Sequence, residues 1–345
     1  MTIPGLADIR TQKVYDGDVL GRLRMNKSSG ILWVAIPVVL ILMGCPMPVW
    51  QGDSPPDDRL PRVRQAGVLA NPALVETSGL VSSTREPGLL WAVNDGGHPP
   101  VLYALKTDGR DDGQIAVEGA ANVDWEDLAV FIREDRAYIL IADVGDNKAV
   151  RDTCCIYVVP EPVRQATGNF RAAVRVAWQV RYRYEDGPRD CEGVAVDTRT
   201  SQILLITKRT NPPQIYTLPL QPPSDAIVTA RRAGEIPFMP ASTLEDMIRY
   251  PGFGAVLSQP TSFDIRRDNR LAVVLTYKDA YLFQRDPDES WAFALARKPF
   301  ALHLPRLAQQ ETACFSLDGR TLYISTEKRP SPLLAIDVAG LPGTL

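Results

Sequence analysis

The chain of 345 residues is long enough for one large domain or two ordinary ones. Its 45% hydrophobic and 23% charged residues are typical of a globular protein, and a net charge of −3 offers no basic surface for nucleic acid. Two histidines without CxxC or HExxH spacing argue against a zinc site built from histidine or thiolate ligands, and 29 prolines with 24 glycines indicate many turns rather than a helical bundle.

The N-terminal part has the pattern of a bacterial lipoprotein signal. Residues 31–50 carry no charge, and Arg22, Arg24 and Lys27 precede them. Leu42-Met43-Gly44-Cys45 has the leucine, the small residue and the cysteine of a lipobox. We therefore expect a diacylglycerol on the Cys45 thiol and a further acyl chain, such as palmitate, on the new amino terminus. An uncleaved signal anchor is the alternative, because about 20 apolar residues can also span a bilayer.

These patterns divide the chain into four parts. We expect residues 1–24 to be a misassigned extension, because Met25 begins a better signal sequence than Met1. Residues 25–44 are then the signal peptide, 45–60 a tether rich in proline and aspartate, and 61–345 the folded domain. The basic flank before the apolar run places that domain outside the cytoplasm. This predicts a lipid-anchored protein of the cell envelope, in the periplasm or on the cell surface, whose first partner is the membrane.

Beyond the tether, one pattern recurs five times. A polar residue opens a short apolar strand, a turn follows, and a second apolar strand ends in polar residues. The copies begin at Ser78-Gly79-Leu80, Glu126-Asp127-Leu128, Glu192-Gly193-Val194, Thr261-Ser262-Phe263 and Glu311-Thr312-Ala313. Turn residues such as Asp268-Asn269 and Asp318-Gly319 lie between the two strands, as a hairpin requires.

A third strand follows in every copy, and alternating stretches such as residues 174–180 can serve as a fourth. Four short strands per copy predict an all-β fold, a β-propeller of four-stranded blades. The fifth copy lacks its fourth strand, and residues 62–69 can supply it, which closes the ring at five blades. A sixth, degenerate blade between Leu220 and Pro260 is the alternative, although residues 243–248 are more typical of a short capped helix.

The repeat also predicts where polar residues gather. The first strand of a blade leaves one face of the ring and the second strand returns to it, so the residues that open one and close the other share a mouth of the central channel. Glu126, Glu192 and Glu311 are such openings. At the same mouth we place Asn94, Asp95, Asp124, Asp143, Asp146, Asn147, Asp190, Lys208, Lys278 and Glu327.

Carboxylates that converge on one axis repel each other unless a cation or a shared proton relieves them. Hard oxygen ligands suit Ca²⁺ or Mg²⁺, and such an ion would polarise a phosphoryl or carbonyl oxygen of a bound ligand. We expect its ligands to be Glu126, Glu192, Glu311 and Asp143. The alternatives are a water-filled polar channel, or neutralisation of the glutamates by Lys208, Lys278 and Lys328.

Smaller features leave more than one interpretation. Asp143-Val144-Gly145-Asp146-Asn147 is either a cation-binding loop or ordinary turn chemistry. His98 follows the second strand of the first copy, and a lone loop histidine is usually solvated. Cys154 and Cys155 either form a vicinal disulfide or pair elsewhere, whereas Cys155, Cys191 and Cys314 are equally compatible with buried strand positions.

Several segments follow each other in a familiar order: Glu76–Leu80, Trp91–Asp95, Asp124–Ala129, Ala142–Asn147, Ile156–Pro162 and Tyr184–Gly187. Together they resemble a largely uncharacterised family of exported bacterial β-propeller proteins, over most of the mature chain. The resemblance implies the fold and export and brings no reaction. The acidic mouth is also similar in concept to gluconolactonases, paraoxonases and β-propeller phytases, which are calcium-bearing propellers that hydrolyse lactones or phosphate esters. The chain departs from these in blade count and in Lys208 and Lys278.

Two functions follow from these patterns. The first is an anchored binding or scaffold propeller that engages an envelope protein, a glycan or a small molecule through the loops of its mouth. The alternative is a calcium-dependent hydrolase of a phosphoester or lactone. The sequence contains no GxSxG elbow, no P-loop and no evident general base, which favours the binding role.

Overall fold

The computed structural model describes residues 62–223 and 226–341. The expected extension 1–24, signal peptide 25–44, tether 45–60 and lipidated Cys45 lie outside these ranges. The described part is an all-β domain with two short helices, α1 and α2, and one turn of 3₁₀ helix. No helix in it is long and apolar enough to cross a membrane.

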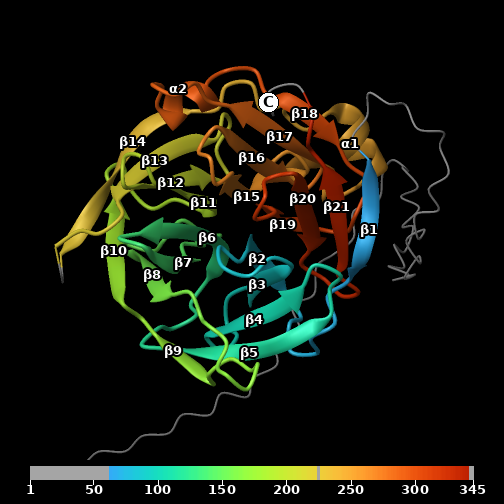
Figure 1. Ribbon diagram of the computed structural model, residues 1–345. Coiled ribbons are helices and arrows are strands. Elements are labelled where there is room, and N and C mark those ends of the chain that lie inside the picture. The colour runs from blue at the N-terminus through green and yellow to red at the C-terminus, as the bar shows by residue number, and fades with distance from the viewer. Residues whose placement is uncertain (1–61, 224–225, 342–345) are drawn as a thin grey trace, which may run out of the picture. The chain divides into compact units, whose positions relative to one another are not determined.

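The strands form antiparallel units of four, numbered here in chain order (Figure 1). The first unit contains β2 (Thr77–Ser82), β3 (Leu89–Asn94), β4 (Val101–Lys106) and β5 (Asp111–Glu118). The second contains β6 (Trp125–Arg133), β7 (Arg136–Asp143), β8 (Cys154–Pro160) and β10 (Trp178–Tyr184). The third contains β11 (Cys191–Asp197), β12 (Gln202–Thr207), β13 (Gln214–Pro219) and β14 (Ile227–Glu235).

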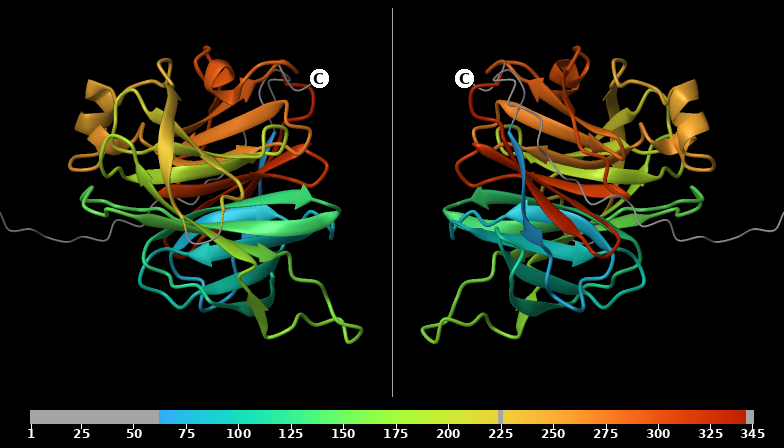
Figure 2. Two further views of the ribbon diagram at one scale, coloured as in Figure 1. Left: turned by 90° about the vertical axis from the view of Figure 1, so that its left-hand side faces the viewer. Right: turned by 90° about the vertical axis from the view of Figure 1, so that its right-hand side faces the viewer.

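The fourth unit contains β15 (Pro260–Ile265), β16 (Leu271–Thr276), β17 (Asp279–Gln284) and β18 (Phe300–His303). The fifth combines β19 (Gln310–Phe315), β20 (Thr321–Thr326) and β21 (Pro332–Asp337) with β1 (Val63–Val68). β1, blue in Figure 2, lies beside the red strand β21. The two strands run antiparallel, with Val63 opposite Ile336 and Val68 opposite Pro332. The segment 62–69 therefore supplies the strand that the sequence predicts for it, and pairing between the two ends of the domain closes the last unit.

The fourth strand of the second unit differs from the expectation. Residues 174–180 do not form one strand, because β9 (Ala173–Arg175) pairs in parallel with β5 of the first unit, and β10 begins only at Trp178. β10 also pairs in parallel with β14, which joins the second and third units at their outer edges. These pairings cover strand edges that would otherwise expose unpaired main-chain groups. The choice of edge depends on the neighbouring unit, so the alternating pattern alone could not predict it.

The units are arranged in a ring around the innermost strands (Figure 1). Within the described residues, β2 contacts β6, β6 contacts β11, β11 contacts β15, β15 contacts β19, and β19 contacts β2 again. A separate hydrophobic cluster fills each interface between neighbouring units, including the one between the fifth unit and the first. Four-stranded sheets that pack face to face around a central axis define a β-propeller.

Burial follows from this packing. The innermost strands β2, β11 and β19 and the second strands β3 and β16 are buried along their whole length, because neighbouring units cover both faces. The outer strand β10 instead alternates between buried and exposed residues. Turns between the first two strands place Asn269 and Gly319 at φ of 60° and 70°, a region that asparagine and glycine tolerate.

The segment between β14 and β15 contains α1 (Leu244–Arg249) and the 3₁₀ turn Gly254–Val256, with no further strand among its described residues. The Thr243 side chain accepts from the Asp246 N–H, and the Asp246 carboxylate accepts from the Thr243 N–H, which is a capping box. The short capped helix predicted for residues 243–248 is therefore confirmed.

Candidate functional site

Every innermost strand has the same irregularity at the same repeat position. The pairing register shifts across the second residue of each strand, which is Ser78, Glu126, Glu192, Thr261 or Glu311. A bulged residue leaves the regular ladder, and its side chain is redirected. The sequence grouped these residues as strand openings but gave no sign of the bulge.

The two hydroxyl-bearing positions join neighbouring units. Ser78 Oγ donates to the Trp125 carbonyl at 2.7 Å, and Thr261 Oγ1 donates to the Gln310 carbonyl at 2.9 Å. Each bond runs from one innermost strand to the next around the ring. The three glutamate positions carry charge instead, and that charge needs balancing inside a buried site.

Lys208 balances part of this charge. Its Nζ lies 2.6 Å from Glu192 Oε1 and 5.1 Å from the centre of the Tyr277 ring. Burial opposes the charged form, but Glu192, Glu311 and Glu126 attract it more strongly, so the pKa of Lys208 lies above its ordinary value. Lys208 is in direct contact with Glu192 alone of the three glutamates, so the predicted neutralisation by Lys208 is present for Glu192.

The pKa values of Glu192 and Glu311 are both raised. Burial raises the pKa of Glu192 to about 7, in spite of its bond to Lys208. Burial and repulsion by Glu192 raise the pKa of Glu311 well above its usual range. Lys208 thus pairs with one of the two carboxylates, and burial and repulsion favour the protonated form of the other.

Asp95, Asp124 and Glu126 form a second group, which we call the acidic triad. One carboxylate oxygen from each lies within 4.8 Å of the others, and no other group of this kind occurs among the described residues. Burial, followed by repulsion from Asp95, raises the pKa of Asp124 to about 6. Burial, with repulsion from Glu192, Asp95 and Asp124, raises the pKa of Glu126 well above its usual range. Only 5% of Glu126 is exposed, and no N–H or O–H group in the described ranges donates to its carboxylate.

Two glycines allow the main chain to approach the acidic triad. A Cβ on Gly145 would lie 2.1 Å from Glu126 Oε1 and 2.6 Å from Asp124 Oδ2. A Cβ on Gly96 would lie 2.6 Å from Asp124 Oδ1. Any larger residue at either position would enter the space beside the carboxylates. The loop 143–147 therefore takes part in the site through Gly145, which the sequence did not single out.

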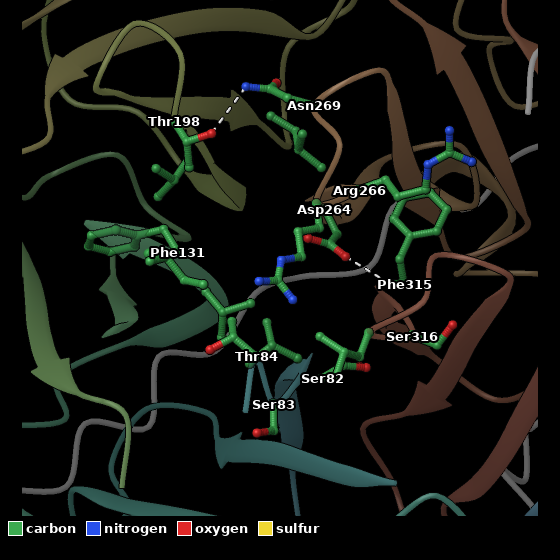
Figure 3. A pocket seen from close by; sticks show the side chains of 17 residues that line it. Ser82, Ser83, Thr84, Phe131, Thr198, Asp264, Arg266, Asn269, Phe315 and Ser316 are labelled. Atoms are coloured by element: carbon green, nitrogen blue, oxygen red, sulfur yellow. Dashed lines mark hydrogen bonds between the residues drawn. The ribbon is translucent and has the colours of Figure 1, made fainter. Parts of the chain in front are cut away.

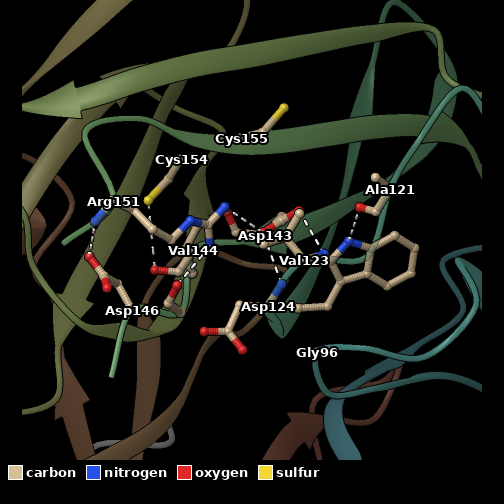
Figure 4. A network of polar contacts seen from close by, with 12 residues as sticks. Gly96, Ala121, Val123, Asp124, Asp143, Val144, Asp146, Arg151, Cys154 and Cys155 are labelled. Carbon is tan, nitrogen blue, oxygen red and sulfur yellow. Dashed lines mark hydrogen bonds and ion pairs between the residues drawn. The ribbon is translucent and has the colours of Figure 1, made fainter. Parts of the chain in front are cut away.

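Asp143 and Asp146 face Arg151 rather than the triad (Figure 4). Arg151 Nη2 lies 2.7 Å from Asp143 Oδ1, and the Arg151 N–H donates to Asp146 Oδ2 at 2.7 Å. The Asp143 carboxylate also accepts the main-chain N–H groups of Val123 and Asp124. Asp143, expected as a metal ligand, thus holds the segment that carries Asp124, and its role at the site is to position that residue.

Asp190 and Asn147 form the rim beside this network. Asp190 Oδ1 accepts the Asp146 N–H at 3.0 Å, and Asp190 Oδ2 lies 2.6 Å from Arg209 Nε. Asn147 accepts a hydrogen bond from the same guanidinium. Both residues lie at the predicted mouth, where Arg209 links the second and third units.

The remaining predicted mouth residues have structural partners. Asn94 accepts the N–H groups of Val75 and Glu76, and Glu327 accepts from the Gln309 side chain. Lys278 Nζ donates to both oxygens of Asp246 at 2.9 and 3.0 Å, so it pairs with α1 rather than with the glutamates. Lys328 is exposed. Of the three lysines expected to neutralise the glutamates, only Lys208 is bonded to one.

The cysteines and His98 lie outside this chemistry. Cys154, Cys155, Cys191 and Cys314 are free thiols, so of the interpretations left open for them the structure has neither the vicinal disulfide nor another pairing among the described residues. Successive strand residues point to opposite faces, so Cys154 Sγ faces the Val144 carbonyl and Cys155 Sγ faces Gln179 (Figure 4). His98 Nε2 lies 2.7 Å from Glu76 at the surface.

Asp127 closes the middle of the channel. Its Oδ2 accepts the Val194 N–H of β11 and the Phe263 N–H of β15, both at 3.0 Å. β6 and β15 are not neighbours in the ring, so this carboxyl crosses the channel. The sequence pattern showed Asp127 only as the residue after a strand opening, because one blade alone does not reveal partners on the other side of a ring.

Comparisons with known proteins name no function for this chain. No protein-family model and no curated protein matches the chain. Among solved structures, the domain is similar to the crystal structure of RRP9 WD40 repeats, with 10% identity and a TM-score of 0.42 over 80% of this chain and 99% of that chain. Strand pairing and the ring of contacts among the innermost strands show the β-propeller fold. The fold and site define a β-propeller with an acidic channel mouth.

Proposed function

We propose that the chain is a lipid-anchored envelope protein whose β-propeller is a binding or scaffold domain, with Ca²⁺ or Mg²⁺ held at the channel mouth by Asp95, Asp124 and Glu126. The anchor rests on the lipobox at Cys45. The closed order of contacts among the innermost strands and the pairing of β1 with β21 support five blades. An envelope protein, a glycan or a small molecule would bind at the loops around the ion.

The acidic triad carries the cation proposal. Three carboxylates converge, and the most buried of them, Glu126, has no donor among the described residues. Such a group is stabilised either by a proton or by a cation. Oxygen ligands in a compact carboxylate group suit a hard divalent ion, and Gly96 and Gly145 let the main chain pack against these carboxylates without a Cβ clash. Glu192 is less suited as a metal ligand because its carboxylate already forms an ion pair with Lys208.

A calcium-dependent hydrolase of a phosphoester or lactone is the alternative. The same ion would polarise the substrate oxygen. Hydrolysis also needs a base or nucleophile positioned beside the substrate, whereas binding needs only the ion and the surrounding loops. The buried thiols have pKa values raised by burial, to about 11 for Cys154 and Cys155, which makes them poor nucleophiles. A binding role therefore needs no catalytic base or nucleophile, whereas hydrolysis needs one beside the ion.

Thermal melting of the full chain in detergent micelles tests the cation. Near pH 8, CaCl₂ or MgCl₂ at a hundredfold excess over Kd is expected to stabilise the fold by about 2.7 kcal/mol. Near pH 4 the effect is expected to disappear, because the raised pKa values of Asp124 and Glu126 keep both groups protonated there. An ion that competes with protons must show this pH dependence.

Two glycine variants make the test specific. Gly145→Ala places a methyl group against Glu126 and Asp124 and is expected to abolish the calcium shift. Gly234→Ala is the matched control, because its Cβ would meet Ala292 at ordinary distances, 3.6 Å to Cβ and 4.0 Å to the carbonyl oxygen. Equal calcium shifts in both variants, or no shift in the wild type, would refute the cation site. For the anchor, Cys45→Ser is expected to lose labelling by a fatty-acid analogue, with Cys155→Ser as the control.

A further inference from the structure

The far mouth of the channel contains a cavity of about 310 Å³ (Figure 3). All innermost strands contribute to it near their last residues: Ser82 of β2, Phe131 of β6, Val196 of β11, Asp264 of β15 and Phe315 of β19. The cavity therefore lies on the axis of the ring. Its volume is at the lower end of the range of about 300–1,000 Å³ that is usual for small-molecule sites.

This cavity is separate from the acidic triad. The Asp127 carboxyl crosses the channel between them and bonds the main chain of β11 and β15. A ligand in the far mouth thus cannot touch Asp95, Asp124 or Glu126. An inference about this cavity does not rest on the proposed cation.

Asp264 is the acidic side chain that lines the cavity. One of its oxygens accepts the Phe315 N–H at 2.8 Å (Figure 3), and no side chain of the described residues donates to the carboxyl. A carboxyl without a cationic partner is costly to keep in a half-buried place. Burial raises the pKa of Asp264 to about 7, so near neutral pH this group both accepts and donates hydrogen bonds.

Two arginines follow Asp264 in the same turn. Arg266 is paired with Asp268 at 2.7 Å. Arg267 lines the cavity, is exposed, and has no ion pair within the described ranges. The lining therefore includes a carboxyl and the guanidinium of Arg267 beside that of Arg266, together with apolar side chains such as Val81 and Ile265.

Hydrogen-bond networks hold the rim of the cavity in place before a ligand binds. Glu161 accepts from Ser83 Oγ at 2.5 Å and from Trp91 Nε1 at 3.1 Å, and it also bonds Thr84, so one carboxylate holds the loop after β2. On another side of the rim, Asn269 donates to Asp197 at 2.7 Å. A rim held in this way loses little conformational freedom when a ligand binds.

We propose that the far mouth binds a neutral, hydroxyl-bearing small molecule of the size of a monosaccharide. A hydroxyl group both donates and accepts, so one ligand pairs with Asp264 and with Arg267 at once. The apolar side chains cover its C–H groups. A ligand with net charge would place a like charge against either Asp264 or Arg267.

Saturation-transfer NMR on the full chain in detergent micelles tests this proposal. The neutral probes are glucose, galactose and N-acetylglucosamine, and the charged probes are glucuronate and ethanolamine. At least one neutral sugar is expected to receive saturation, and Asp264→Ala is expected to weaken its binding about tenfold. Asp288→Ala at the exposed surface is the matched control, and it should bind as the wild type does.

Two milder variants distinguish a loss of sugar binding from a loss of folding. Asp264→Asn keeps an acceptor for the Phe315 N–H, and Ile132→Trp enlarges a side chain that is already exposed at the opening. Both are expected to be at least as stable as the wild type and to weaken sugar binding. The proposal is overturned if no neutral sugar binds, if both variants bind as the wild type does, or if glucuronate or ethanolamine binds more tightly than every neutral sugar.

Discussion

The two mouths of the channel are made by the same innermost strands but differ in chemistry. At the acidic mouth a bulge repeats in every strand, and three of the five bulged residues are glutamates. At the far mouth the strands end in unlike turns, and a single carboxyl, Asp264, lines the cavity. The repeat therefore fixes where side chains meet, and the residue in each copy decides what they do. A symmetric ring holds two unlike sites in this way.

The acidic mouth depends on charge balance, so removal of its lysine is expected to have the largest effect. Lys208→Met leaves Glu192 buried without its 2.6 Å partner. Loss of one member of a buried pair typically costs about 3–5 kcal/mol. We expect a loss of this size near pH 8 in urea unfolding, and a smaller loss near pH 5, where the glutamates are protonated.

The sign of this pH dependence follows from the raised pKa values. A carboxyl whose pKa is raised on folding contributes stability below its unfolded pKa and loses it as pH rises through the folded value, which is about 7 for Glu192. Without Lys208 that folded value rises further, so stability falls over a wider range of pH. Lys148→Met, at an exposed position, should change nothing. A Lys208→Met loss that is equal at both pH values would contradict the charge-balance explanation.

Asp127 separates the two mouths, and its removal is the next largest change. Asp127→Ala leaves the N–H groups of Val194 and Phe263 without acceptors. Each buried N–H left unsatisfied costs about 1–3 kcal/mol, so we expect a total loss of about 3 kcal/mol in urea unfolding. Asp288→Ala, at the surface, is the control. A loss below about 1 kcal/mol would show that the crossing bonds contribute little.

The fold was largely predictable from the sequence because each copy of the repeat has the strand and turn pattern of one blade. Hydrophobic runs such as Leu89–Asn94, with turn residues at a constant interval, are buried on both faces by neighbouring blades, and this requirement is visible in each copy. The closing strand followed from the same count, since the last copy lacked a partner for β21. The edge pairing of β9 with β5 was not predictable, because it joins segments that share no local pattern.

For the site, the sequence predicted which residues share one mouth of the channel but not how their side chains pair. Repeat positions brought Glu126, Glu192 and Glu311 to one mouth, but the sequence could not assign a partner to each carboxylate. Lys208 forms an ion pair with Glu192, and Arg151 forms one with Asp143. Asp95 and Asp124 join Glu126 because loops of two units meet there, and Gly145 gives them room. Side-chain partners depend on ångström-scale distances that composition and spacing do not record.

The smallest expected effect is at the far mouth, where the titration of one carboxyl distinguishes this site from the acidic mouth. Burial raises the pKa of Asp264 to about 7, so its contribution to stability is complete below about pH 4 and is lost as pH rises through 7. Asp264→Asn keeps the bond to Phe315 and removes this titration. Because the carboxyl is half-buried, we expect the variant to gain only about 1 kcal/mol over the wild type near pH 8, and nothing near pH 4. Urea unfolding at the two pH values measures this difference. An equal difference at both would mean that Asp264 does not titrate in this range, and the two mouths would then differ in shape more than in charge.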